Sequence, residues 1–396
     1  MSGIARAPFF HTRADRIDLA RQRYFEDGIA PSGIVSEAVF QSWTRCQRLH
    51  ANPAGEVVFQ PVSASRTNLS LQKNRPLHEA WAAELPALET ILGTTTCAGM
   101  LTDATGLLIG ATCAGRAHEH LMPIATRLGV DLSEEAVGTT APGVVARTGR
   151  PVCVQGAEHF FDDVKAMNCA AAPVRDVHGR VAGVLDISSE SMPFNFDAAS
   201  VVGLFAGAIE NRLLVAQARD HLVVHLQVAP TLLDSPVVGL IGVDTNGYVA
   251  WCNGVASRLL GLSTHWTPVE QMSAEAALGA DVSSLMALLA SGTAVLRLPN
   301  GLRVWARAAL PASDGHRNVV PVPPEPPPPP PREDFSDVLP DQETVRDPRA
   351  SLRECDRDLI GRTIAECGGS ISKAARKLSV SRGLIYRRLR NPGMNP

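Results

Sequence analysis

The sequence predicts a multidomain α+β protein that ends in an all-α domain. Three observations indicate this fold class: paired strand patterns interleaved with helical segments, a proline run that no packed domain contains, and a short basic segment of helical periodicity after that run. With 396 residues and 45% hydrophobic content, the chain is long and apolar enough for about two to four packed domains.

Two hairpins are expected in the first half of the chain. GMLTDATGLLIGAT places strand-like runs on both sides of a turn at residues 103–106, and CAAAPVRDVHGRVAGVLDIS does the same around residues 176–179. Both hairpins belong to one antiparallel sheet with flanking helices. We therefore expect an α+β sensor domain over residues 75–215, after an N-terminal helical lead-in over residues 1–74.

The segment between the hairpins carries the start and stop signals of a helix. In GTTAPGVVARTG, Thr139 or Thr140 can cap the first turn, Pro142 fits within it, and Gly149 follows the last turn. The next stretch, PVCVQ, predicts a further strand.

A long apolar helix is expected after the second hairpin, followed by a connecting helix over residues 216–229. The long helix either packs on its own sheet or pairs across a dimer as a signalling helix, and the sequence leaves both interpretations open. Its apolar stripe consists of Val202, Phe205, Ile209, Leu213 and Ala216.

The next segment, LLDSPVVGLIGVDTNGYVAWCNGVASRLLG, predicts a strand, a turn at Asn246 and Gly247, a second strand and a short helix. This order resembles the opening of a PAS domain, and NGLRVWARAALP supplies a later strand. We expect a short PAS-like domain over residues 230–312 that serves as a spacer or a dimer contact.

A proline-rich and acidic linker is expected over residues 313–348. Nine of the eleven residues in 321–331 are proline, which has no backbone N–H and fixes φ. Such a run adopts solvated polyproline II and spans roughly 34 Å at about 3.1 Å per residue. The linker is therefore a stiff spacer.

Charge is distributed unevenly on the two sides of this linker. From Arg349 to the end there are 11 Lys and Arg against 4 Asp and Glu, whereas the whole chain has a net charge of −3. A basic module on an acidic protein favours a polyanion, most commonly nucleic acid.

The basic module, residues 349–396, has the pattern of a helix-turn-helix. GGSISKAARKLSVSRGLIYRRLR supplies a helix stop at the glycines, a short helix with small inward alanines, a turn and a basic third helix. The alternative is a small three-helix bundle whose arginines only form a solvent-exposed face and bind nothing. These residues resemble the Fis family of DNA-binding domains. That resemblance implies double-stranded DNA contacts from Lys373, Ser381, Arg382, Tyr386, Arg387 and Arg388.

A second resemblance covers about residues 35–215. SWTRCQRLHANP, LTDATGLLIG, SEEAVGTTAPG and AEHFFDDVKAMNC are similar to the GAF-containing N-terminal half of acetoin-catabolism-type regulators, which activate sigma-54 RNA polymerase. The family's usual Asn after GT is Thr140 here. The resemblance implies a GAF-like pocket for a small-molecule effector, whose identity and lining residues the sequence does not give.

The ATPase of those activators has no counterpart in this sequence. An AAA+ motor needs G-x-x-x-x-G-K-[ST], but none of the four lysines follows a glycine, and residues 311–349 are too few for such a domain. ATP is therefore not expected as a cofactor, and the chain is not expected to activate sigma-54 polymerase by itself.

Two further groups of residues could carry chemistry. In EHFFDD, His159 and Asp163 would share a helical face and could bind a metal, and Cys97, Cys113 and Cys169 are redox candidates that lie among apolar neighbours. We predict no catalytic residue and no metal ligand. The alternatives are a GAF-type thiol enzyme that resembles methionine sulfoxide reductases, and a nucleoid-architectural DNA binder.

The prediction from sequence is a ligand-responsive DNA-binding transcription regulator that acts as a homodimer and is not an enzyme. Its expected partners are double-stranded DNA and a small effector, with RNA polymerase or a motor-bearing paralogue as further candidates. No apolar run reaches 18 residues and the first residues lack a secretory signal, so we expect a cytoplasmic, nucleoid-associated protein without a membrane partner.

Overall fold

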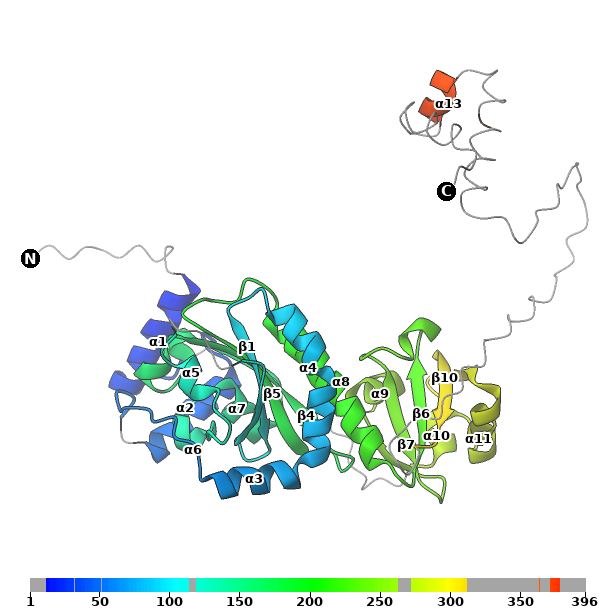
Figure 1. The fold of residues 1–396 in the computed structure, drawn as a ribbon, viewed down its shortest axis with the longest axis horizontal. Helices are drawn as coiled ribbons and strands as arrows, with labels where there is room; N and C mark the ends of the chain where they lie inside the picture. Colours follow the sequence, from blue (N-terminus) through cyan, green and yellow to red (C-terminus); the bar gives the residue numbers. More distant parts are fainter. Residues whose placement is uncertain are drawn as a thin grey trace, which may run out of the picture. The chain divides into compact units, whose positions relative to one another are not determined.

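The computed structural model describes residues 12–31, 33–50, 52–113, 119–262, 272–311, 363 and 371–377. The chain divides into two compact units, Met1–Val320 and Pro321–Pro396. Unit 1 contains two five-stranded antiparallel sheets, each covered by helices (Figure 1). An α+β architecture for this part of the chain is thus confirmed.

The first sheet has the strand order β2-β1-β5-β4-β3, and all its neighbouring strands are antiparallel. β4 and β5 are its longest strands and form its centre together with β1. The strands are β1 (Cys97–Asp103), β2 (Leu108–Ala111), β3 (Val152–Gln155), β4 (Met167–Arg175) and β5 (Val181–Glu190).

Helices cover both faces of this sheet, because its side chains alternate between two apolar clusters. One face packs against α1, α2, α5, α6 and α7, and the opposite face packs against α4 and α8. The helices are α1 (Arg13–Asp27), α2 (Glu37–Leu49), α3 (Ala64–Lys73), α4 (Arg75–Leu92), α5 (Met122–Ala125), α6 (Glu134–Val137), α7 (Ala141–Thr148) and α8 (Ala198–Gln217), with short 3₁₀ turns η1 (Gly156–Glu158) and η2 (Asp162–Val164).

The local expectations for this region are confirmed. β1 pairs with β2, and β4 pairs with β5, as the two hairpin patterns predict. α7 begins after Thr140, whose side chain accepts a hydrogen bond from the N–H of Gly143, and it ends at Gly149 with φ of 62°. Thr140 therefore supplies the cap in the position where the family usually has Asn.

The N-terminal helices form part of the core of the first sheet rather than a separate lead-in. Ile17 of α1 and Val39 and Trp43 of α2 lie in the same buried cluster as Met100 of β1. The indole N–H of Trp43 donates to the carbonyl of Glu158 at 2.7 Å. α1, α2 and this face of the sheet thus share one hydrophobic core.

Helix α8 lies between the two sheets. The expected stripe packs on the first sheet: Val202, Phe205, Ile209 and Leu213 are buried there, whereas Ala216 is exposed. Leu214, one position further, packs on the second sheet instead. α8 is long and apolar enough to cross a membrane by composition alone, but this packing is that of a core helix.

The second sheet has the order β8-β7-β6-β10-β9. Its central strand β6 corrects the sequence expectation, because Leu222–Gln227 lies inside the segment expected as a connecting helix over residues 216–229. Val223 and Val224 face opposite sides of the sheet, which suits β-branched side chains. The strands are β6 (Leu222–Gln227), β7 (Gly239–Val243), β8 (Val249–Cys252), β9 (Thr293–Arg297) and β10 (Arg303–Ala309).

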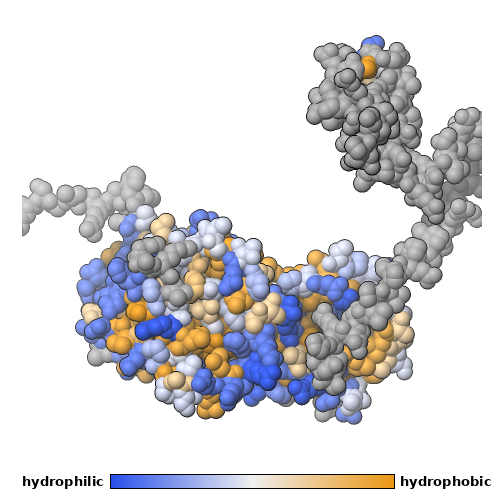
Figure 2. All heavy atoms as spheres, viewed as in Figure 1, coloured by the Kyte–Doolittle hydropathy of each residue, from blue (hydrophilic) through white to orange (hydrophobic). Residues whose placement is uncertain are grey.

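Three helices cover the outer face of the second sheet. α11 leaves Val282, Met286 and Leu289 between 37% and 43% exposed, and apolar surface is visible over this end of unit 1 in Figure 2. These elements are α9 (Gly254–Leu260), α10 (Ala274–Leu278) and α11 (Val282–Ser291), after the 3₁₀ turn η3 (Pro230–Leu232).

Polar side chains of α8 form hydrogen bonds with both the first and the second sheet regions. Glu210 accepts a hydrogen bond from the N–H of Arg175 at 2.9 Å and another from the N–H of Gly254. Burial raises the pKa of Glu210 to about 7. Asn211 accepts from the side chain of Asn253 at 2.7 Å. The start of α9 is therefore held directly by α8.

Asn253→Ala is expected to destabilise unit 1 by about 2–3 kcal/mol, because several buried groups lose a partner at once. Its Oδ1 accepts from the N–H of Ala256 at 2.9 Å and of Leu240 at 3.0 Å, and its Nδ2 donates to the carbonyl of Val238 at 2.8 Å. Ser273→Ala, which removes one exposed cap bond, is the matched control and should cost about 1 kcal/mol. Urea unfolding measures both, and equal losses would contradict the prediction.

Candidate functional site

One helix of the basic module is described in unit 2. α13 (Ile371–Lys377) contains an exposed Lys373 and a fully buried Ala374, which agrees with the expected short helix and its inward alanine. Thr363 is also buried and helical. The remaining residues expected at the DNA lie outside the described residues: Ser381, Arg382, Tyr386, Arg387 and Arg388.

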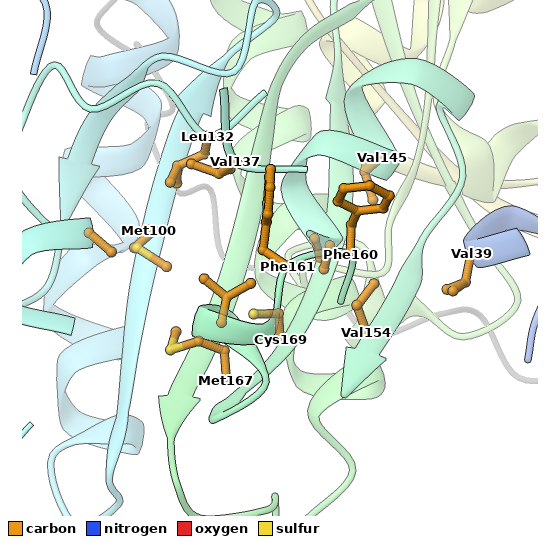
Figure 3. Close-up of a cluster of buried hydrophobic side chains, with 14 of the residues drawn as sticks. Val39, Met100, Leu132, Val137, Val145, Val154, Phe160, Phe161, Met167 and Cys169 are labelled. Atoms are coloured by element: carbon orange, nitrogen blue, oxygen red, sulfur yellow. The ribbon is translucent and has the colours of Figure 1, made fainter. Parts of the chain in front are cut away.

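The candidate effector site in unit 1 is the buried region between one face of the first sheet and the helices α1, α2 and α5–α7 that cover it. Side chains from the sheet and from the segments that cover it point toward one another there (Figure 3). Most of them are apolar, and each labelled residue is less than 9% exposed. The labelled side chains are Val39, Met100, Leu132, Val137, Val145, Val154, Phe160, Phe161, Met167 and Cys169.

A carboxylate lies inside this apolar interior. Asp186 occupies the middle of β5, opposite Met100 of β1 and Ala171 of β4, and is fully buried. The hydroxyl of Ser188 donates to its Oδ2 at 2.6 Å, whereas Oδ1 has no hydrogen-bond partner. Burial raises the pKa of Asp186 to about 7, and the Ser188 hydrogen bond only partly opposes this shift.

A histidine and a thiol meet beside this carboxylate. Nδ1 of His159 donates to the carbonyl of Gly156 at 3.0 Å, and its Nε2 lies 3.5 Å from Sγ of Cys169. Burial lowers the pKa of His159 to about 4 and raises the pKa of Cys169 well above its ordinary value. Both groups are therefore neutral near pH 7, and the thiol is not an activated nucleophile.

A second polar network joins α2 to α6. Glu134, with a fully buried side chain, accepts two hydrogen bonds from Arg45 at 2.7 Å and one from the hydroxyl of Ser42 at 2.5 Å. Ser42 also contacts the hydroxyl of Thr139 at 2.8 Å. This network brings together SWTRC and SEEAVGTT, two of the segments that resemble the acetoin-type regulators.

The candidate metal pair does not share a face. His159 points into the interior, whereas Asp163 accepts a hydrogen bond from the N–H of Val57 at 3.1 Å. The segment is two short 3₁₀ turns rather than one helix. Its neighbour Asp162 instead pairs with Arg21 at 2.9 Å and anchors α1.

The redox candidates differ in exposure. Cys97 and Cys169 are buried, as expected for small apolar residues, whereas Cys113 is exposed. Reactive cysteines combine access with a depressed pKa, and the two buried thiols lack the access that turnover of a sulfoxide would need. The structure thus gives the thiol-enzyme alternative no supporting geometry among these described cysteines.

A cleft of about 400 Å³ opens between the two sheets of unit 1. The β4–β5 turn and the β7–β8 turn form its walls, and two of its titratable side chains accept hydrogen bonds from within the protein. Asp244 accepts from two backbone N–H groups, and His221 accepts from the indole of Trp251 at 3.3 Å. The lining residues are Val177, His178, His221, Asp244, Asn246, Tyr248, Val249, Ala250 and Trp251.

Sequence reasoning did not single out Asp186 or Glu134, nor Thr102 of β1, whose buried hydroxyl has no hydrogen-bond partner. A signal existed for the first, because VAGVLDIS places a carboxylate inside an apolar strand. Whether it points inward depends on strand pairing, which periodicity alone does not fix when both faces of the sheet are buried.

Comparison with known families identifies both ends of the chain. Residues 12–203 match the MimR N-terminal domain, and residues 351–391 match the Fis family of bacterial regulatory proteins. The chain combines a MimR N-terminal domain with a Fis-type helix-turn-helix. Neither matched domain is an AAA+ ATPase.

Three curated proteins that this chain resembles are named as regulators of catabolic genes. The chain is 32% identical to the acetoin catabolism regulatory protein of Cupriavidus necator, over 41% of this chain and 25% of that protein. It is 29% identical to the propane 2-monooxygenase operon activator MimR of Mycolicibacterium smegmatis, over 49% and 32% of the two chains. It is also 29% identical to the acetoin dehydrogenase operon activator AcoR of Bacillus subtilis, over 50% and 33%. The resemblance to acetoin-type regulators is confirmed, and the chain spans about a quarter to a third of the length of these relatives.

Proposed function

We propose that this protein is a ligand-responsive transcription regulator that binds double-stranded DNA. One observation carries the proposal: a MimR N-terminal domain and a Fis-type helix-turn-helix occur on the same chain. In this proposal the first sheet with its helices is a GAF-like sensor, the second sheet is a PAS-like domain, and residues 313–348 are the linker to the DNA reader.

The regulator acts without a motor of its own. No phosphate-binding loop occurs in the sequence, and the stretch between β10 and the DNA reader is too short for an AAA+ domain. It therefore represses, competes with motor-bearing relatives for their sites, or contacts RNA polymerase, rather than remodelling a sigma-54 complex. The protein works in the cytoplasm, on the nucleoid.

A homodimer on a two-fold operator accounts best for specific binding by so small a reader. One recognition helix makes few base contacts, and two half-sites about one helical turn apart add their contacts. The effector is a small metabolite, in keeping with relatives named for acetoin and propane catabolism.

Arg382→Ala tests the DNA reader. A guanidinium that binds guanine O6 and N7 contributes about 1–3 kcal/mol per half-site, so the variant should bind its sites roughly 5- to 150-fold more weakly per half-site. Genome-wide mapping of the bound sites, followed by titration of a mapped site with purified protein, measures this.

Arg357→Ala is the control for that experiment, because it removes the same charge from the basic module outside the recognition segment. It should weaken binding to all sequences modestly and equally. If native protein occupies no discrete sites, or if both variants lose affinity equally, the basic module is not a sequence reader.

A further inference from the structure

Two buried side-chain oxygens without hydrogen-bond partners lie on one face of the first sheet. They are Oδ1 of Asp186 on β5 and Oγ1 of Thr102 on β1, and both residues are fully buried. Buried polar atoms in native proteins nearly always have a partner, so an exception needs an explanation. Two exceptions on adjacent strands point to a common cause.

The strand register makes these two residues diagonal neighbours. Asp186 pairs with Met100, and Thr102 pairs with Val184, so all four side chains share the face that is covered by α1, α2 and α5–α7. Diagonal neighbours on antiparallel strands are about 7–8 Å apart. A molecule with one or two hydroxyl groups can bridge that spacing, because each O–H···O bond spans about 2.7–2.8 Å.

We propose that this face of the first sheet binds the effector, that Asp186 and Thr102 are its polar anchors, and that the effector is a small neutral molecule bearing hydroxyl groups. This inference rests on the proposed function of the chain as a ligand-responsive regulator. It adds the place of the site and the chemical class of the ligand.

The surroundings select that class. Oδ1 accepts a hydrogen bond when the carboxyl is charged and can donate one when it is protonated, and a hydroxyl can serve both states without bringing a charge into the apolar interior. No basic side chain among the described residues pairs with Asp186, so an anionic ligand here would meet a buried carboxyl of like charge with no cation beside it. Met100, Leu132 and Val137 offer apolar contact to the carbon skeleton (Figure 3).

The cleft between the sheets is the competing location. It is open, Tyr248 at its rim is 40% exposed, and its Asp244 and His221 already have partners. A ligand in the cleft would replace water, whereas a ligand at Asp186 and Thr102 would give hydrogen bonds to two buried oxygens that have none within the protein. Asn246→Ala, on the cleft wall, is therefore the control that distinguishes the two locations.

Thermal unfolding of the full chain tests the anchors without a ligand. Thr102→Val replaces an unpartnered hydroxyl with a methyl group, and Asp186→Leu removes the unpartnered Oδ1 together with the hydrogen bond from Ser188. Both variants should raise the melting temperature, by about 2–8 °C for Thr102→Val and by less for Asp186→Leu, because the Ser188 hydroxyl then loses its acceptor. Thr126→Val is the matched control. Its buried hydroxyl donates to the carbonyl of Met122 at 2.7 Å, so this variant should melt lower. If both anchor variants melt lower as well, the two groups are structural and the proposal is overturned.

Melting with added probes tests the ligand class. Propane-1,2-diol and butane-2,3-diol at up to about 100 mM should raise the melting temperature of native protein, whereas acetate and butylamine should not. Asp186→Asn keeps the size of the side chain and an acceptor for Ser188, and it should need at least tenfold more diol for the same shift. The Asn246→Ala protein should respond like native.

Several results would overturn the inference. They are no shift of native protein with either diol, an equal shift in the Asp186→Asn protein, or a response lost only in the Asn246→Ala protein. Because no DNA is present, these failures are distinct from failure of the proposed function. A protein that binds discrete DNA sites through Arg382 but ignores the diols remains a regulator with a different effector site.

Discussion

Glu134→Ala should destabilise unit 1 by about 3 kcal/mol, in the lower part of the roughly 3–5 kcal/mol range found when one partner of a buried ion pair is removed. The Glu134 side chain is fully buried and accepts hydrogen bonds from Arg45 and Ser42. The side chain of Arg45 is 30% exposed. In the variant, water can therefore solvate part of its unpaired charge, which reduces the loss of stability.

The double variant Arg45→Met/Glu134→Leu separates two effects: the cost of leaving a buried charge without its partner and the cost of lost packing. Removing both charges together leaves no unpaired guanidinium, so the double variant should recover most of the stability that Glu134→Ala loses. Urea unfolding followed by circular dichroism at 222 nm measures all three proteins. A loss below about 1 kcal/mol for Glu134→Ala would show that the pair contributes little.

This ion pair also joins two segments that lie far apart in the sequence and resemble the same family. SWTRC on α2 and SEEAVGTT before α7 contact each other through Arg45, Ser42 and Glu134. EHFF is joined to the same region, because the indole of Trp43 in SWTRC donates to the carbonyl of Glu158 at 2.7 Å. Arg21 of α1 also donates to the carbonyls of His159 and Phe160, both at 2.6 Å. These segments therefore form one side of the fold rather than separate sites.

Features set by local chemistry were predictable from the sequence. The limits of α7 follow from a capping Thr140, a proline in the first turn and Gly149, and both hairpins of the first sheet follow from D-x-x-G turns between strand-like runs. Each of these signals acts within about ten residues. No tertiary contact is needed to read them.

Features set by tertiary contacts were not predictable in this way. β6 was expected as a helix because Leu222–Gln227 is a short apolar run directly after a long helix, and such a run fits either structure until its partner strands are known. The inward position of Asp186 depends on its pairing with β1 and β4. The DNA-contacting residues remain a prediction from pattern and family resemblance.

Asp186→Asn should change how the stability of unit 1 depends on pH. Burial raises the pKa of Asp186 in the folded protein to about 7, above about 3.9 for an unfolded chain. The folded state therefore binds the proton more tightly, so native protein loses stability as the pH rises from about 4 through 7. Asparagine does not titrate. The free energy of unfolding of the variant, relative to that of native protein, should therefore rise by up to about 4 kcal/mol across that window and stay constant above it.

The difference between the two proteins isolates this carboxylate. Glu210, whose pKa is also raised to about 7, contributes the same slope to both proteins and cancels. Cys169, the titratable neighbour on β4, stays protonated over the window, and His159 behind it is neutral above about pH 5 because burial lowers its pKa to about 4. Urea unfolding at pH 5, 6, 7 and 8 provides the measurement, and parallel stability curves would show that Asp186 is not desolvated.

The same measurement with diol present connects the titration to the proposed effector site. A hydroxyl that donates to Oδ1 stabilises the charged carboxylate and lowers its pKa in the bound state. Saturating diol should therefore reduce the loss of stability of native protein between pH 5 and 8 and leave the Asp186→Asn protein unchanged. A diol that stabilises native protein equally at every pH would bind away from Asp186, because binding at Oδ1 must be linked to its proton.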